Sequence, residues 1–167
     1  MIDISKYTYK EDIKPILKYV KVENNQAVAT DSFRIAILDI PENYSEVIKD
    51  GLYTKEKWKA ITKEINQKKP DLSKIEILVK ESMLYQPELE PYPDFKRIIP
   101  SEDELINFNA SLPGVNINYF NDFLSDVVIS ENIRHDNIFW NRIKQNDKMY
   151  VYMKEGIILL LMGLSKE

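Results

Sequence analysis

The chain has 167 residues, a formal net charge of −4 and 30% charged residues, a length that suits one domain or two small ones. It contains no cysteine, which excludes disulfides, thiolate metal sites and thiol catalysis. With one histidine and four glycines, it shows neither a histidine-based catalytic triad nor a glycine-rich phosphate loop. The mild acidity gives no support for nucleic-acid binding through overall charge, although a local basic face remains compatible with it.

Targeting and membrane signals are absent from the sequence. Residues 1–5 carry neither a basic region nor an apolar run, so they do not resemble a secretory signal. The longest apolar run, Ile157 to Met162, is too short to span a bilayer. We therefore expect a cytoplasmic protein with no membrane association, no cofactor and no metal.

A hairpin is predicted near the N-terminus, after a polar, tyrosine-rich segment over 1–12 that we expect to be loosely packed. Tyr19–Glu23 alternates as a strand, Asn24-Asn25 is a turn signal, and Gln26–Ile40 returns. Asp31 and Phe33 interrupt an otherwise apolar face of the returning strand. This suggests a bend near Asp31-Ser32, where the face switches. The alternative, which we favour from this stretch alone, is a hairpin with a hydrogen-bonded Asp at its mouth.

A lysine-rich helix is predicted next. Thr54 is its expected N-cap, the helix covers Lys55–Gln67, and Pro70 ends it. Trp58, Ile61, Thr62 and Ile65 form its apolar stripe. Lysines at 55, 57, 59, 63, 68 and 69 occupy the remaining surface. Such a surface is either a solvated face or one that faces phosphates.

Strands and an extended segment are expected from residue 74 to residue 100. The β-branched residues of Lys74–Lys80 favour a strand, which Met83–Tyr85 continues. Gln86–Pro93 is a proline-rich acidic loop, and two prolines in Tyr92–Pro100 favour extended backbone. The acidic loop has no histidine or further carboxylate motif that would favour a metal site.

The remaining chain repeats the pattern of strands around a helix. Ser101–Glu104 resembles a capping box, but we favour a turn followed by a strand over Leu105–Ala110, before a turn at Pro113-Gly114. Asn116 or Asn118 then caps an acidic helix. Strands are expected at 139–144, 149–154 and 157–164. The fold class is α+β, with two half-repeats that each pack one helix on a mostly antiparallel sheet.

Three blocks resemble the bacterial DNA polymerase III β subunit, the sliding clamp. Ala29–Ala36 is similar to the family's A-T-D-G-H-R-L-A, with Ser32-Phe33 in place of Gly-His. Tyr92–Pro100 is similar to F/Y-P-D-Y-R-R-V-L-P, and Leu160–Leu164 is a weaker match to the family's ending. The resemblance implies a DNA-clamp-like fold, shortened and divergent. Residues 1–100 correspond to most of the clamp's middle domain and 101–167 to half of its last domain, and the two parts pack separately or as one domain.

In this family the three blocks line a cleft that takes short linear peptides from polymerases and other replication proteins. The resemblance assigns to that cleft Leu17, Thr30, Ser32, Phe33, Arg34, Ile35, Pro93, Arg97, Ile98, Leu160, Leu161, Met162 and Leu164. Apolar side chains and a flexible methionine suit peptide anchors such as Leu and Phe. Arg34 and Arg97 are expected at the rim, where they would offer hydrogen-bond donors.

The family also lines its DNA hole with helices, and the resemblance assigns Lys55, Lys59, Lys63 and Lys68 to that role. It implies a replication processivity factor, not an enzyme, that binds polymerase peptides and encircles double-stranded DNA as a homo-oligomer. The alternative is a clamp-derived peptide-binding adaptor or decoy that does not encircle DNA. The acidic second helix, with Asp122 and Asp126, counts against a DNA-facing position.

Overall fold

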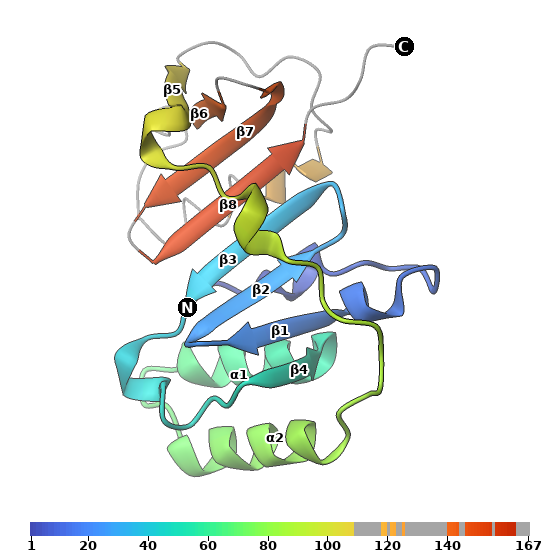
Figure 1. The fold of residues 1–167 in the computed structure, drawn as a ribbon. Coiled ribbons are helices and arrows are strands. Elements are labelled where there is room, and N and C mark those ends of the chain that lie inside the picture. The colour runs from blue at the N-terminus through green and yellow to red at the C-terminus, as the bar shows by residue number, and fades with distance from the viewer. Residues whose placement is uncertain are drawn as a thin grey trace. The chain divides into compact units, whose positions relative to one another are not determined.

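The computed structural model describes residues 1–108, 118–119, 121–122, 125, 140–143, 146–154 and 156–162. It divides into two compact units, Met1–Tyr92 and Pro93–Glu167 (Figure 1). The chain therefore changes unit at Tyr92-Pro93, before the boundary expected between residues 100 and 101.

Unit 1, Met1–Tyr92, contains a four-stranded antiparallel sheet. The strands are β1 (Tyr19–Glu23), β2 (Gln26–Thr30), β3 (Arg34–Asp39) and β4 (Gly51–Thr54), in the order β4-β1-β2-β3. Asn24 and Asn25 both have positive φ, which asparagine tolerates better than most residues. The predicted hairpin is confirmed at this turn.

The predicted returning strand is two strands, because the chain reverses between Thr30 and Arg34. Ala29 pairs with Ala36 and Thr30 with Ile35. Since directly opposed residues share a face, Ala29 and Ile35 lie on opposite faces of the sheet. The predicted face switch near Asp31-Ser32 is confirmed. It arises from a hairpin turn between β2 and β3 and not from a bend within one strand.

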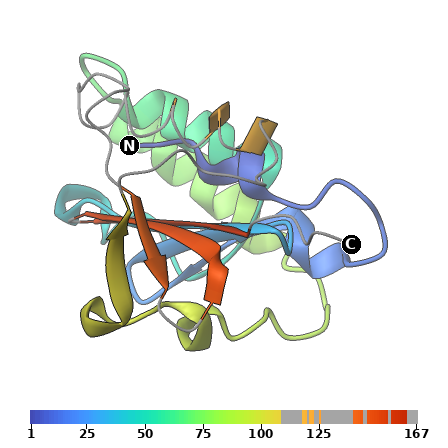
Figure 2. The same cartoon turned by 90° about the horizontal axis from the view of Figure 1, so that it is seen from above.

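Two helices cover one face of this sheet (Figure 2). Helix α1 (Lys55–Ile65) begins at Thr54, whose Oγ1 accepts a hydrogen bond from the Lys57 backbone N–H. This confirms the predicted helix and its N-cap, although the helix ends before Gln67. Its apolar stripe is buried, with Trp58 and Ile61 fully so.

Helix α2 (Leu72–Leu84) contradicts the strands predicted over 74–80 and 83–85. Asp71 caps it, accepting a hydrogen bond from the Lys74 backbone N–H at 3.3 Å. Ile75 and Val79 are buried while Ile77 is exposed. The burial therefore follows helical spacing, and the alternation of β-branched residues that favoured a strand has no packing role.

The N-terminal segment 1–12 was expected to be loosely packed, and this prediction is wrong for residues 1–8, whereas residues 10–12 are exposed. It contains the 3₁₀ helix η1 (Ile4–Tyr7), in which Ile4 and Tyr7 are almost completely buried. Two further 3₁₀ helices, η2 (Pro15–Lys18) and η3 (Glu42–Tyr44), lie in the connections. Residues 1–7 are thus part of the core of unit 1.

Unit 2, Pro93–Glu167, is described in part. It contains the 3₁₀ helices η4 (Phe95–Ile98) and η5 (Glu102–Glu104), then β5 (Leu105–Phe108), β6 (Trp140–Ile143), β7 (Asn146–Lys154) and β8 (Ile157–Met162). These four strands are antiparallel in the order β8-β7-β6-β5. Extended backbone was expected at the two X-Pro junctions of this segment, and Ile99 before Pro100 is extended, while η4 forms between the junctions. The predicted strand after Ser101–Glu104 is confirmed.

The fold is α+β, as predicted. The described residues 118, 119, 121, 122 and 125 are helical, in agreement with the expected second helix. One helix per half is incorrect for unit 1, which carries both α1 and α2. The turn expected at Pro113-Gly114 lies outside the described residues.

Candidate functional site

The turn between β2 and β3 is held by side-chain hydrogen bonds. The Asp31 carboxylate accepts from the backbone N–H groups of Phe33 and Arg34 and from Arg34 Nε, at 3.1, 3.0 and 2.9 Å. Oγ1 of Thr30 donates to the Arg34 carbonyl and accepts from the Ser32 N–H. Ser32 has φ of +77°, so these bonds hold a conformation that L-residues rarely adopt.

Arg34 belongs to the interior of unit 1. It is 6% exposed, its guanidinium donates to the Lys6 carbonyl at 2.9 Å, and it lies 4.7 Å from the Tyr7 ring centroid. The expectation that Arg34 offers hydrogen-bond donors at a cleft rim is therefore corrected. Arg34 contacts Asp31 in the turn and both Lys6 and Tyr7 in η1, so it connects the turn to η1.

The predicted cleft residues of unit 1 separate into a surface pair and a buried set. Phe33 is 55% exposed, and Ser32 is exposed with its Oγ 3.1 Å from Lys14 Nζ. The residues that are buried are Leu17, Thr30 and Ile35. Only the tip of the turn is thus accessible to a ligand, and Phe33 is its apolar contact.

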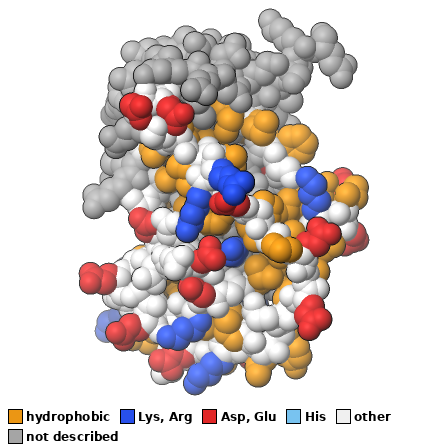
Figure 3. Space-filling model, in the orientation of Figure 1, with side chains coloured by type: hydrophobic (Ala, Val, Ile, Leu, Met, Phe, Trp, Pro, Cys, Tyr) orange, Lys and Arg blue, Asp and Glu red, His pale blue; other side chains and the backbone are white. Residues whose placement is uncertain are grey.

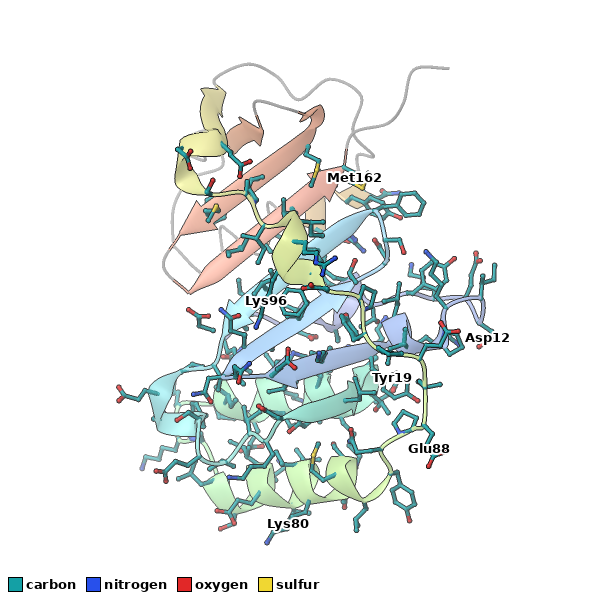
Figure 4. The ribbon with its side chains drawn as sticks, viewed as in Figure 1. Asp12, Tyr19, Lys80, Glu88, Lys96 and Met162 are labelled. Carbon is teal, nitrogen blue, oxygen red and sulfur yellow. The ribbon has the colours of Figure 1, made fainter. Side chains whose placement is uncertain are left out.

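The predicted cleft residues of unit 2 also divide into exposed and buried ones. Arg97 has a largely exposed side chain that pairs with Asp94 at 2.8 Å, and Pro93 is exposed. Met162 on β8 (Figure 4) and Ile98 on η4 are roughly half exposed. Leu160 and Leu161 are buried. Leu164 lies outside the described residues. Each set is described within its own unit, so the cleft as a whole stays a prediction.

Tyr92, the first residue of the second resembling block, closes unit 1. Its hydroxyl lies 3.5 Å from the Val28 carbonyl of β2, and Lys21 Nζ lies 5.8 Å from its ring centroid. Burial raises the pKa of the Tyr92 hydroxyl well above its ordinary value. Tyr92 therefore stays neutral and fixes the start of the proline-flanked segment.

The outer surface of α1 carries a row of lysines. Lys59 and Lys63, one turn apart, are exposed, as is Lys68 beyond the helix end, while Lys55 is half-buried. Like charges four residues apart cost an isolated helix about 0.2–0.5 kcal/mol, so this spacing brings no stability of its own. Glu56 lies on the same surface near the first turn.

Other lysines of this region are neutralised. Lys57 pairs with Glu81 and Lys74 with Glu64, and both contacts join α1 to α2. The hydrogen bond from Lys74 is the largest cause that lowers the pKa of the Glu64 carboxyl below its ordinary value. The ion pairs hold the helices together, and in the described chain no ion pair is recorded for the four lysines assigned to DNA.

A hollow of about 360 Å³ extends this basic surface at the start of α1. Three lysines, Lys10, Lys18 and Lys55, line it together with one acid, Glu56. The hydroxyl-bearing residues that also line it are Thr8, Tyr9, Tyr19 and Thr54. Lys18 pairs with Asp12, whose side chain is almost fully exposed. Positive side chains beside the first turn of a helix favour anions.

Sequence reasoning missed α2 and the part that Lys10 and Lys18 take in this hollow. The signal for α2 was Asp71 three residues before Lys74, a helix-capping spacing. No local signal could have found the two lysines, because the backbone bond from Tyr9 N–H to the Leu17 carbonyl brings their segments together.

Neither a metal centre nor a membrane-crossing helix was found in the described part of the chain. It contains no group of His, Asp or Glu side chains that could hold a metal ion. None of its helices is both long and apolar enough to cross a bilayer. In the comparisons with known proteins, no family model, no curated protein and no solved structure matches the chain.

Proposed function

We propose that this chain is a sliding-clamp-like replication factor that binds duplex DNA along α1 and binds short linear peptides of polymerases or related proteins. The observation that carries the DNA part is the exposed row of Lys59, Lys63 and Lys68, which begins at the hollow lined by Lys10, Lys18 and Lys55. In the described part of the chain these three lysines have no ion-pair partner, so their ammonium groups are available to backbone phosphates. Affinity of this kind rises as salt falls.

The resemblance of three sequence blocks supports the clamp-like assignment and the peptide part. Phe33, Ile98 and Met162 expose apolar side chains, and Arg97 exposes a guanidinium beside Asp94. A leucine or phenylalanine anchor of a peptide that is fully buried contributes about 1.5–3 kcal/mol. The proposal therefore assigns anchor contacts to these apolar residues and a polar contact to Arg97.

The DNA part is tested by fluorescence anisotropy with a labelled duplex at low salt. The double variant Lys59→Glu, Lys63→Glu should weaken binding by at least about tenfold, because two attractive charges become repulsive. The matched control is Lys49→Glu, Lys96→Glu, which makes the same charge change at two exposed lysines that are not part of α1. Equal losses in the two variants would mean that only overall charge matters and would contradict a role for α1.

The peptide part is tested with a peptide of Gln-Leu-x-Leu-Phe character. Met162→Ala and Arg97→Ala should each weaken binding, and Ile13→Ala, at an exposed apolar residue outside the assigned set, should not. Binding that survives both substitutions would reject the assigned residues. Peptide binding in a chain that has no affinity for DNA would instead support the adaptor or decoy function.

A further inference from the structure

The outer surface of α2 exposes large apolar side chains that nothing in unit 1 covers. Leu72, Ile77 and Leu84 are 49%, 56% and 74% exposed. Figure 3 shows hydrophobic side chains interspersed with acidic and basic ones at the foot of the view, where α2 lies. Ile77 and Leu84 lie close together around the helix, and Leu72 lies further around it, at its other end. Large exposed apolar side chains on one helix are typical of a contact surface for another protein.

Helix α2 carries four charged residues, of which two pair with α1 and two do not. Lys74 and Glu81 are engaged with α1, through Glu64 and Lys57. Glu76 and Lys80 remain, both exposed and one turn apart, and Lys80 points away from the sheet (Figure 4). These two charges are opposite, so two copies of the α2 face can meet without net repulsion.

The positions of these residues are symmetric about Leu78. Glu76 and Lys80 lie two residues to either side of it, and Leu72 and Leu84 lie six residues to either side. Consider a two-fold antiparallel contact whose symmetry axis crosses the helix at the level of Leu78. In it, each Glu76 meets a Lys80 of the other copy, and each Leu72 meets a Leu84. A two-fold contact repeats every pair twice, so both ion pairs and both leucine pairs form together.

The helix geometry suits this contact. Residues 72, 76, 80 and 84 are spaced by four and form one ridge along α2. Ridges of this kind on two helices pack at a crossing angle of about 50°, with the axes roughly 8–10 Å apart. Ile77 lies beside the ridge near the symmetry axis, where its copy would be its neighbour.

A groove next to the ridge provides room for side chains of the second copy. It measures about 690 Å³ between α2 and the segment 46–49. Its apolar lining is Val47, Val79, Met83 and Leu84, and its charged lining is Glu46, Lys49, Glu76 and Lys80, two acids and two bases. The wall is fixed, because the buried Tyr53 hydroxyl donates to the Lys49 carbonyl at 2.7 Å and accepts from the Lys49 N–H at 3.1 Å. Burial raises the pKa of that hydroxyl to about 12, so it stays a donor at neutral pH.

We propose that two copies of this chain associate through α2 in an antiparallel, two-fold contact, with Glu76 of each copy paired to Lys80 of the other. Leu72 of each copy packs against Leu84 of the other at the mouth of the groove. The contact needs neither DNA nor a peptide, so it stands or fails separately from the clamp-like function.

The contact is tested with charge-reversal variants of the full chain. Analytical sedimentation over a range of concentrations measures how strongly each variant dimerises. The wild type should form dimers at micromolar concentration. Glu76→Lys and Lys80→Glu should each weaken dimerisation by at least about tenfold, because like charges then meet twice. The double variant Glu76→Lys, Lys80→Glu should return to within about threefold of the wild type, since the pairs are only exchanged.

Mixing the two single variants gives a second readout, which intrahelical effects do not produce. Equimolar Glu76→Lys and Lys80→Glu should form a heterodimer that is tighter than either homodimer, because each like-charge contact becomes an opposite-charge contact. Leu84→Gln should weaken the dimer, while Ile13→Gln, at an exposed residue outside the ridge, should not. A wild type that stays monomeric, a double variant that fails to recover, or an absence of heterodimer would each overturn the proposal.

Discussion

The β2–β3 turn and helix α1 of unit 1 use charged side chains in opposite ways. In the turn, Asp31 and Arg34 are both buried and each satisfies several hydrogen bonds of the other or of the backbone. On α1, Lys59 and Lys63 stand exposed on the surface. In the turn the charged groups stabilise the backbone conformation. On α1 the exposed lysines are accessible to a ligand.

The largest expected effect breaks the turn. Asp31→Ala leaves the buried Arg34 guanidinium without its counter-ion and should lower the free energy of unfolding by about 3–5 kcal/mol. Urea denaturation measures this, with Asp39→Ala as the control. Asp39 is an exposed carboxylate that accepts a hydrogen bond from Gln26. Similar small losses in both variants would mean that the Asp31–Arg34 pair does not hold the turn.

Two buried threonines, one in the turn and one on α1, differ in whether their hydroxyl groups form hydrogen bonds. Thr30→Val should lower the free energy of unfolding by about 1–3 kcal/mol, because the Ser32 N–H and the Arg34 carbonyl lose their partner. Thr62→Val on α1 should leave it unchanged or raise it. Among the described residues no partner exists for the buried Thr62 Oγ1. Equal losses at both positions would show that Thr62 is satisfied after all.

The smallest expected effect concerns the paired acid of α1. The Glu64 carboxyl has a lowered pKa in the folded chain, chiefly through the hydrogen bond from Lys74. A group of this kind contributes stability above its unfolded pKa, about 4.3, and the contribution is lost as the pH falls through the folded value. Glu64→Gln should therefore flatten the acid side of the stability profile, as thermal melts from pH 6 to pH 3 would measure. An unchanged stability profile would contradict the claim that the hydrogen bond between Glu64 and Lys74 stabilises the folded chain.

Local signals were sufficient for part of unit 1 and insufficient for the rest. Thr54 and the stripe from Trp58 to Ile65 predicted α1, and Asn24-Asn25 predicted the hairpin, because capping and turn chemistry are read within a few residues. Helix α2 was mistaken for a strand, because Ile75, Ile77 and Val79 fit period two and the cap at Asp71 was overlooked. The burial of Tyr7 depends on contacts distant in sequence, which no local pattern reports.

The candidate site shows the same division. The exposure of Lys59 and Lys63 follows from helical periodicity and was predicted. The buried position of Arg34 was not, because it depends on the Lys6 carbonyl and the Tyr7 ring in a segment that was expected to be loose. A residue whose partners are remote in the sequence cannot be assigned to surface or interior from its own neighbourhood.

The salt dependence of DNA affinity tests the central claim most directly. Binding of a duplex to the wild type and to Lys59→Glu, Lys63→Glu is measured from low to moderate salt, and log affinity is plotted against log salt. Each lost phosphate contact lowers the magnitude of the slope by about 1, so the account predicts a slope that is lower by about 2 in the variant. Equal slopes, or a wild type that does not bind at the lowest salt, would contradict the claim that the exposed lysines of α1 face DNA.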